Sequence, residues 1–431
     1  MANDSLFVRK IIKQCLLEYL SAQTPLDRVL NETLREHRVG SQQRSEISDT
    51  VYKCTRFWNT LYQTQKFHPE KIADQRILEA GIERAHKLTR EELFKLHEQA
   101  KPRFEKDSQN HLSGLHGVPD ALMSEFYRLD EPQKSAYHQY LHQSIEEAPV
   151  TIRWNPKKIT IEGIREALGD VLVQAHPFLE GCGYLEKRVN LRQHSLFEEG
   201  LVDFQDESSQ LVTRLCLAQP GEKILDLCAG AGGKSLHLSE MMERQGEIFA
   251  YDVSKVKLAE LVKRARRQNI SNIRVLDQLP THETFDLILV DAPCSGLGVL
   301  RRNPERLARI HSAELRRWEK VQAEVLDWAV RHLNKNGRLV YATCTLRDQE
   351  NAAQVYQVVQ SANREWQSVD LQFQKTFGKI EGDELLTLLR QTPAARMSEH
   401  KSPGFLQWGP SHLSQASGAW RGDGFFVSLV K

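Results

Sequence analysis

The segment Phe285-Asp-Leu-Ile-Leu-Val-Asp-Ala-Pro-Cys294-Ser-Gly296 reads as an apolar β-strand followed at once by reactive side chains. A short continuous apolar run bounded by turn residues is consistent with a strand buried on both faces, as in a parallel sheet. Open α/β sheets bind their ligands at the carboxyl ends of such strands. We therefore expect the Asp291 carboxylate and the Cys294 thiol to lie at a ligand-binding edge.

A second apolar segment, Gly337-Arg-Leu-Val-Tyr-Ala-Thr-Cys344-Thr345, also ends in a cysteine. Both segments follow the glycine-rich turn Ile224-Leu-Asp-Leu-Cys-Ala-Gly-Ala-Gly-Gly-Lys234. One thiol could attack an electron-poor carbon while the other thiol, or the carboxylate, handles protons. Covalent catalysis needs this division of labour, so the pattern predicts an enzyme.

Strand and helix patterns alternate from residue 219 onward, which predicts a doubly wound α/β sheet. Asn336-Gly337 is expected to cap the last long helix. The expected strands are 223–227, 247–251, 273–276, 285–290, 338–342 and, at the sheet edge, 424–430, and the expected helices begin near 233 and cover 255–267 and 312–333.

The rest of the chain predicts two further regions. Apolar residues at helical spacing, as in 7–20 and 47–61, indicate an all-α region. The helical spacing of apolar residues ends before Val150-Thr-Ile-Arg-Trp154, a short run that is typical of a β-strand. We therefore expect domains at 1–147 (helical), 148–205 (small, α+β) and 206–431 (the doubly wound sheet), and we interpret 370–420 as irregular.

Composition places the chain among ordinary soluble proteins. It has 431 residues, 40% hydrophobic and 27% charged. Its seven cysteines form no Cys-x-x-Cys pair, so neither a disulfide framework nor a metal site is expected. With no apolar run of about 18 residues and no leader-like start, the sequence predicts a cytoplasmic protein without a membrane segment. We expect a monomer.

The net charge of +1 conceals local basic clusters. Residues 301–320 hold seven basic side chains, Arg301 and Arg302 among them, against three acidic ones, and 255–274 is a second basic run. Such patches near a catalytic edge suit a polyanion such as nucleic acid, or they are solvated helix faces. Charge alone leaves both interpretations open.

The glycine-rich turn is a candidate cofactor loop, because glycine lets the backbone approach a ligand closely. Asp252 ends the next strand, 19 residues after Gly233, where such folds place a carboxylate for ribose hydroxyls, and Asp277 ends the third strand. A dehydrogenase would use the same layout. The Asp-Ala-Pro-Cys ending of the fourth strand instead favours a methyl donor.

On these motifs the chain resembles the RsmB/Sun and Nop2/NSun family of RNA cytosine-5 methyltransferases. The resemblance covers residues 145–431 and includes Asp203-Phe-Gln-Asp-Glu-Ser-Ser209, Arg301-Arg-Asn-Pro304, Ala342-Thr-Cys-Thr345 and Asp423-Gly-Phe-Phe426. Gln43-Arg-Ser-Glu-Ile-Ser-Asp-Thr-Val-Tyr52 also looks like part of the NusB-like RNA-binding domain of the bacterial RsmB branch. The family's fold implies a class I, Rossmann-like methyltransferase domain after an all-α one.

The resemblance implies a role for each motif. Cys344 would add to C6 of cytosine, Cys294 would assist loss of the C5 proton and product release, and Asp291 would steady the base at N3. Arg301 and Arg302 would contact phosphates of the RNA, expected to be 16S ribosomal RNA. S-adenosylmethionine would be held by Cys228, Ala229, Gly230, Ala231, Gly232, Gly233, Lys234, Asp252 (ribose), Asp277 (adenine side) and Asp291.

Two departures and two rival functions accompany this hypothesis. Family members commonly have proline at Ala231 and serine at Thr345. An amino-directed methyltransferase would leave Cys344 without a role, and a non-catalytic RNA-binding or assembly factor would need neither thiol. The other cysteines, Cys15, Cys54, Cys182 and Cys216, are expected in hydrophobic cores, and Cys228 is expected to act through its backbone.

Overall fold

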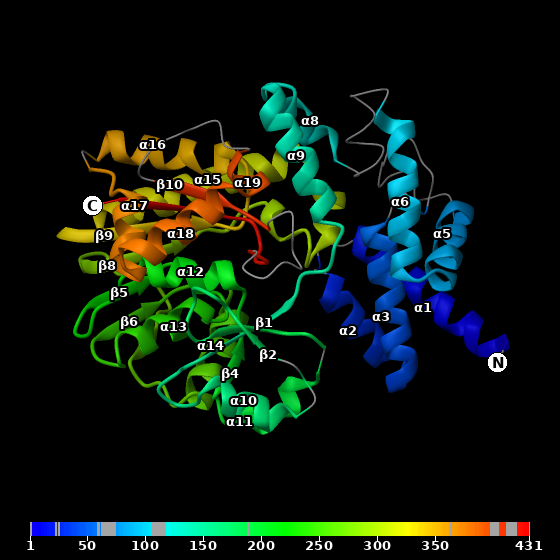
Figure 1. The fold of residues 1–431 in the computed structure, drawn as a ribbon, viewed down its shortest axis with the longest axis horizontal. Helices are drawn as coiled ribbons and strands as arrows, with labels where there is room; N and C mark the ends of the chain where they lie inside the picture. The colour runs from blue at the N-terminus through cyan, green and yellow to red at the C-terminus, as the bar shows by residue number, and fades with distance from the viewer. Residues whose placement is uncertain are drawn as a thin grey trace. The chain divides into compact units, whose positions relative to one another are not determined.

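The computed structural model describes residues 2–21, 24, 26–57, 61, 75–105, 118–169, 171, 173–187, 189–362, 364–396, 405–410 and 420–430 (Figure 1). The chain divides into two compact units. The first contains 1–134, 141–147 and 300–314, and the second contains 135–140, 148–299 and 315–431. The three predicted domain boundaries stay a prediction beside this division.

The first unit is helical, as its apolar spacing predicts. Buried aliphatic side chains such as Ile11, Leu30 and Val51 form its core. Residues 300–314 join this unit, where the buried Tyr19 hydroxyl donates to the Glu305 carbonyl at 2.9 Å. Its helices are α1 (Ala2–Ser21), α2 (Leu26–Glu36), α3 (Ser41–Arg56), α5 (Gln75–Lys87), α6 (Arg90–Glu105), α8 (Asp120–Phe126), part of α9 (Glu131–Gln143) and a short 3-10 helix at Pro304–Arg309.

The second unit begins with a four-stranded antiparallel sheet in the order β2-β3-β1-β4. Ile152 and Trp154 of β1 pack in its apolar core. The small α+β region predicted after residue 148 therefore has this sheet at its centre. The elements are β1 (Val150–Trp154), α10 (Ile161–Leu168), β2 (Val173–Ala175), β3 (Cys182–Leu185), a 3-10 helix (Leu191–Gln193), α11 (Ser195–Glu198) and β4 (Val202–Phe204).

A seven-stranded sheet in the order β10-β11-β9-β8-β5-β6-β7 forms the centre of the second unit. The five strands from β7 to β9 are parallel, and β11 and β10 are added antiparallel. The doubly wound fold predicted from the sequence is confirmed. The strands are β5 (Lys223–Asp226), β6 (Glu247–Ala250), β7 (Ile273–Val275), β8 (Phe285–Asp291), β9 (Leu333–Thr343), β10 (Phe405–Trp408) and β11 (Phe425–Val430).

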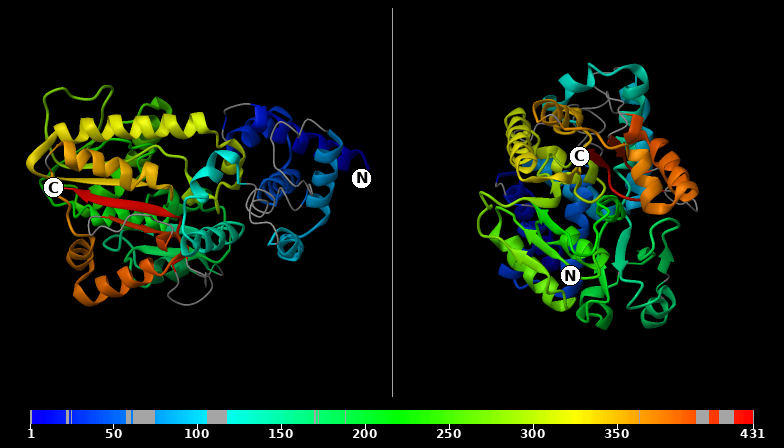
Figure 2. Two further views of the ribbon diagram at one scale, coloured as in Figure 1. Left: turned by 90° about the horizontal axis from the view of Figure 1, so that it is seen from above. Right: turned by 90° about the vertical axis from the view of Figure 1, so that its left-hand side faces the viewer.

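Helices cover both faces of this sheet (Figure 2). Successive side chains of a strand point to opposite faces, so each face has its own apolar cluster. On β5, Ile224 belongs to the cluster with α12, α13, α17 and α18, whereas Leu225 belongs to the cluster with α15 and α16. Among the described residues, no helix is long and apolar enough to cross a membrane. The bounds are α12 (Glu207–Leu215), α13 (Gly233–Met241), α14 (Lys255–Arg267), α15 (Ser312–Arg331), α16 (Ala352–Ser361), α17 (Val369–Phe377), α18 (Lys379–Arg390) and α19 (Pro393–Arg396), with 3-10 helices at Leu297–Val299 and Asp348–Glu350.

The structure corrects three local predictions. Residues 370–420 are not irregular throughout, because α17, α18, α19 and β10 lie there. Gly337 does not cap a helix: α15 ends at Arg331, and β9 starts at Leu333, which pairs with Phe285. The terminal strand β11 is not the sheet edge, since β10 pairs outside it.

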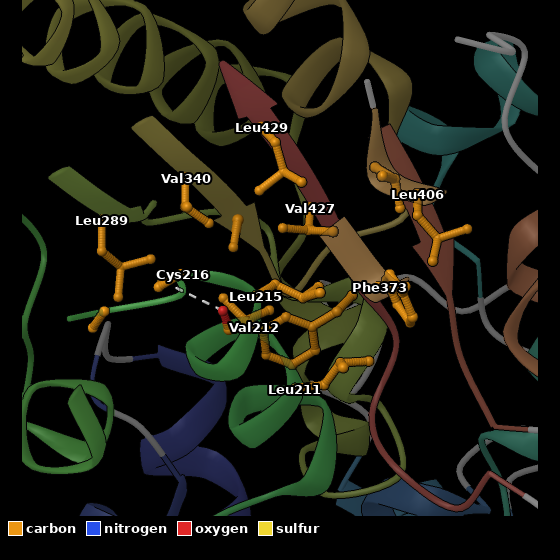
Figure 3. Close-up of a cluster of buried hydrophobic side chains, with 14 of the residues drawn as sticks. Leu211, Val212, Leu215, Cys216, Leu289, Val340, Phe373, Leu406, Val427 and Leu429 are labelled. Carbon is orange, nitrogen blue, oxygen red and sulfur yellow. Dashed lines mark hydrogen bonds between the residues drawn. The ribbon is translucent and has the colours of Figure 1, made fainter. Parts of the chain in front are cut away.

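Helix α17 belongs to the core beneath the sheet. Phe373 is fully buried against Leu211 and Leu215 of α12 and the strand residues Val427 and Leu429 (Figure 3). On the same helix, Leu371 is 57% exposed. This segment therefore contributes to stability although its sequence pattern is weak.

We predict that Phe373→Ala lowers the free energy of unfolding by about 3 to 5 kcal/mol, because it removes a buried ring and leaves a cavity. The matched control on the same helix is Leu371→Ala, for which urea denaturation should show a much smaller change. Equal losses from the two variants would contradict the packing of α17.

Candidate active site

The carboxyl edge of the parallel strands gathers most of the residues predicted to be functional. Asp226 ends β5, Asp291 ends β8, and Cys344 directly follows β9. Asp252 lies two residues beyond β6. These strands are neighbours in the sheet, so their ends lie along one edge of it.

The loop between β5 and α13 carries the glycines of the predicted cofactor turn. Gly230 and Gly232 have φ angles of 54° and 81°, which disfavour other residues. A Cβ atom on Gly232 would lie 2.4 Å from the Cγ of Leu261, so this position also needs glycine for space. The Ala231 carbonyl accepts from the Arg264 guanidinium at 2.8 Å, which anchors the loop.

Asp252 organises the same loop. One of its carboxylate oxygens accepts from the backbone N–H of Gly230 at 2.9 Å, and the other accepts from that of Ser254 at 2.7 Å. Asp277 differs: its side chain is 95% exposed and pairs with Lys255 at 3.0 Å. The structure thus joins Asp252 to the loop and leaves Asp277 at its periphery.

Lys234 of α13 and Asp291 of β8 form an ion pair at 2.6 Å. The ammonium group is nearly buried and also lies 5.4 Å from the centre of the Phe425 ring. Burial alone would lower the pKa of Lys234, but the Asp291 carboxylate raises it above the ordinary value. Lys234 therefore stays charged and fixes the Asp291 carboxylate, a contact that the sequence does not indicate.

The side chains of the two predicted catalytic cysteines, Cys294 and Cys344, are in contact. Their sulfur atoms lie 3.4 Å apart without a disulfide bond between them. Cys294 is buried, whereas Cys344 is more accessible. The bond with Cys344, and then burial, raise the pKa of Cys294 well above its ordinary value. Cys294 therefore keeps its proton at neutral pH and can donate it to the Cys344 sulfur.

The cysteines expected in hydrophobic cores behave as predicted. Cys15, Cys54, Cys182 and Cys216 are fully buried among apolar side chains. Burial raises the pKa of Cys228 well above its ordinary value, which keeps that thiol protonated. A contribution of Cys228 through its backbone stays a prediction.

The predicted RNA-binding arginines lie in the first unit. The Arg301 guanidinium donates to the Glu147 carbonyl at 2.9 Å and pairs with Glu146 at 3.6 Å, and the Arg301 carbonyl accepts from Arg56 at 2.7 Å. These bonds give Arg301 a part in holding that unit together. An RNA contact by Arg301 or Arg302 stays a prediction.

Sequence reasoning missed two buried carboxylates beside the site. Asp226 is 1% exposed and accepts from the Ser235 hydroxyl at 2.6 Å. Glu350 is fully buried and contacts Ser295 and Thr345, the residues that follow Cys294 and Cys344. An acidic residue in an otherwise apolar strand, Ile224-Leu-Asp226-Leu, was a signal for the first, whereas Glu350 has none because its partners are distant in sequence.

We predict a pH-dependent effect of Asp226→Asn. Burial raises the pKa of Asp226 to about 7, so the folded state holds a proton that the unfolded chain loses near its own, lower pKa. This stabilisation is complete below the unfolded pKa and is lost as the pH rises through about 7. Asparagine mimics the protonated carboxyl, so the variant should gain about 1 to 3 kcal/mol over the wild type between pH 5 and pH 8.

Thermal unfolding at both pH values measures the difference. Asp370→Asn, which alters a half-exposed carboxylate on α17, is the control and should show no such trend. A stability difference for Asp226→Asn that does not change with pH would contradict a buried, protonated Asp226.

Comparisons with known proteins agree with this geometry. The family model of the 16S rRNA methyltransferases RsmB/F matches residues 214–430, half of the chain. Curated relatives named ribosomal RNA small subunit methyltransferase B include one from Salmonella arizonae, 29% identical over 70% of this chain and 65% of its own length, and one from Vibrio cholerae, 31% identical over 57% and 58%. The chain thus spans less than two thirds of these relatives.

Solved structures share the fold. The crystal structure of PH0851 superposes with a TM-score of 0.71 at 20% identity and 98% coverage of both chains. NSun6 from Pyrococcus horikoshii, solved with SFG, gives a TM-score of 0.58 at 18% identity, covering 74% of this chain and 99% of that one. The family match, the fold and the paired thiols at the sheet edge agree, and the chain belongs to the RsmB/F family of 16S rRNA methyltransferases.

Proposed function

We propose that this protein is an S-adenosylmethionine-dependent RNA cytosine-5 methyltransferase that acts on 16S ribosomal RNA through a covalent adduct. The observation that carries the proposal is the 3.4 Å contact between the Cys294 and Cys344 sulfur atoms at the carboxyl edge. Family membership supports methyl transfer to ribosomal RNA. The thiol pair supports carbon as the methylated atom, because methylation of an amino group needs no thiol nucleophile.

The chain's residues fit the methyl donor. The loop of Gly230 and Gly232 lets backbone N–H groups approach a ligand at the start of α13, and Asp252 lies where ribose hydroxyls bind in such folds. The similar NSun6 structure was solved with SFG, an analogue of S-adenosylmethionine. When bound, S-adenosylmethionine supplies an electrophilic methyl group on a sulfonium.

The chemistry follows from the thiol pair. The Cys344 thiolate adds to C6 of cytosine, and the electron pair of the C5–C6 double bond moves into the ring, which makes C5 nucleophilic. After C5 has taken the methyl group, loss of the C5 proton re-forms the double bond and expels the Cys344 thiolate. Cys294 assists that loss: its thiol gives its own proton to the departing Cys344 sulfur, 3.4 Å away, and takes the C5 proton in exchange. Asp291, fixed by Lys234, steadies the base at N3.

The substrate base must be unpaired or flipped out, because C6 and C5 of a stacked cytosine cannot reach a thiol at a sheet edge. We propose that the helical first unit is a NusB-like RNA-binding domain. Arg302 remains a candidate for phosphate contact, and exposed basic residues of α14, such as Lys263 and Arg266, are a second candidate.

We predict opposite failures for the two cysteine variants. Cys344→Ala should abolish methyl transfer without weakening donor binding, because the donor loop is built from other residues. Cys294→Ala should accumulate an RNA adduct on Cys344 that survives a denaturing gel, because addition can proceed while elimination stalls. Cys216→Ala, which removes a buried core thiol away from the site edge, is the control and should keep turnover. Turnover by Cys344→Ala at a tenth of the wild-type rate would refute its role.

We also predict that Asp252→Ala weakens S-adenosylmethionine binding roughly ten- to hundredfold, since each hydrogen bond to a charged group contributes about 1.5 to 3 kcal/mol. Titration calorimetry measures the dissociation constant. The control Asp370→Ala removes a carboxylate that pairs with Arg390 on a helix behind the sheet and should bind normally. An unchanged constant for Asp252→Ala would mean that the donor binds elsewhere.

A further inference from the structure

A fully buried carboxylate, Glu350, joins the two loops that carry the catalytic thiols. It lies in the short helix Asp348–Glu350, after β9. One oxygen accepts from the Ser295 backbone N–H at 2.9 Å. The other accepts from the Ser295 hydroxyl at 2.5 Å and from the Thr345 hydroxyl at 3.3 Å. Ser295 directly follows Cys294, and Thr345 directly follows Cys344, so one carboxylate bridges the neighbours of both thiols.

Further hydrogen bonds reinforce this link between the two loops. The Ser295 and Thr345 hydroxyls lie 2.7 Å from each other. The side-chain amide of Gln322, on α15, donates at 3.1 Å to the Glu350 oxygen that also accepts from the Ser295 N–H, and at 2.9 Å to the Pro293 carbonyl. The Asp-Ala-Pro-Cys turn is therefore held by the same network as the loop after β9.

Charge balance explains how a carboxylate can be buried here. Arg347 pairs with Glu350 at 3.1 Å and with Glu319 of α15 at 2.9 Å. A buried charge is tolerated when it is paired and its remaining lone pairs accept hydrogen bonds, and both conditions hold for Glu350. An ionised carboxylate is also purely an acceptor, so it can face hydroxyl, amide and guanidinium donors at once.

We propose that Glu350 is a positioning residue, which holds the Cys294 and Cys344 loops in the register that brings their sulfur atoms into contact. The expected effect on the rate of methyl transfer rests on the proposed function. The positioning of the two thiols by Glu350 does not depend on it. A misplacement of about 1 Å can cost roughly a hundredfold in rate, so a rigid link between two loops from different strands has a direct kinetic value.

The network also accounts for Thr345, where relatives commonly have serine. The bonds to Ser295 and Glu350 use the hydroxyl, which both residues possess. Thr345→Ser should therefore retain the thiol contact, whereas Thr345→Val, which keeps the shape but lacks the hydroxyl, should loosen it.

The test uses Glu350→Gln in the full-length chain. Glutamine has nearly the same volume as glutamate. Its NH2 group cannot accept a hydrogen bond, so at least one of the bonds that Ser295 and Thr345 donate to Glu350 is lost. Diamide, which takes two electrons and two protons from a pair of thiols, is the probe, and mass spectrometry follows the Cys294–Cys344 disulfide. We expect this disulfide to form at least about tenfold more slowly in the variant, with donor affinity unchanged and kcat reduced about a hundredfold.

If Glu350 acted only through its charge, Glu350→Gln would form the disulfide faster, not more slowly. The bond with Cys344 and burial chiefly raise the pKa of Cys294, and the charge of Glu350 adds to this effect. Removing that charge would lower the pKa and speed thiol oxidation. Slower oxidation in Glu350→Gln therefore reports lost positioning.

Glu319→Gln is the matched control, because it removes a carboxylate from the same arginine, Arg347, while the bonds of Glu350 to Ser295 and Thr345 stay in place. Unchanged oxidation in Glu350→Gln, equal slowing in Glu319→Gln, or no disulfide in the wild type would overturn the proposal. If Glu350→Gln does not fold, Thr345→Val against Thr345→Ser decides it in the same assay. Should the wild type fail to methylate cytosine, the proposed function falls while the oxidation rates still decide the role of Glu350.

Discussion

The parallel pairing of β8 with β9 is the constraint on which the site depends. Asp291 pairs with Ala342 at the end of the ladder, so the loops that follow start side by side. Gly298 then donates its N–H to the Cys344 carbonyl at 2.8 Å and accepts from the N–H of Gly424 at 2.7 Å. A Cβ atom on Gly298 would lie 1.9 Å from the Gly424 carbonyl oxygen, so only glycine permits this approach. These backbone bonds bring together the two loops that carry the thiols.

Around this contact the site concentrates buried charge. Asp226, Asp252 and Asp291 lie at or just beyond neighbouring strand ends, and Lys234 pairs with Asp291. A pKa raised to about 7 leaves part of Asp226 protonated near neutral pH, which reduces the repulsion among the carboxylates. Carboxylates at this edge suit a cationic sulfonium, which is the charge of the proposed methyl donor.

Much of the catalytic domain could be predicted because its signals are local. The helix Lys255–Arg267 has the predicted bounds, and the ends of β5, β6 and β8 fall within a residue or two of those expected. Asn336-Gly337 was misread because these residues suit a helix cap as well as the irregular part of a strand, and the distant pairing of Leu333 with Phe285 decides between the two. Helices α17 and α18 were missed since exposed Leu371 and Ile380 blur their apolar period.

In the site, too, local sequence patterns predict some residues and miss those whose partners are distant in sequence. Cys294 and Cys344 were predictable because each ends its own apolar run. The bridge from Glu350 to Ser295 and the pair of Lys234 with Asp291 link residues more than fifty positions apart, and no local pattern encodes such contacts. A single sequence thus indicates which groups react, whereas the fold determines which groups hold them.

The account's central claim, that Cys344 forms the bond to the base, is tested most directly with RNA containing 5-fluorocytosine at the target position. Fluorine at C5 cannot leave as a proton, so elimination is blocked and the adduct persists. Peptide mapping of the complex by mass spectrometry should find the nucleotide on Cys344. Attachment to Cys294, or methylated RNA released with no adduct at all, would contradict the account.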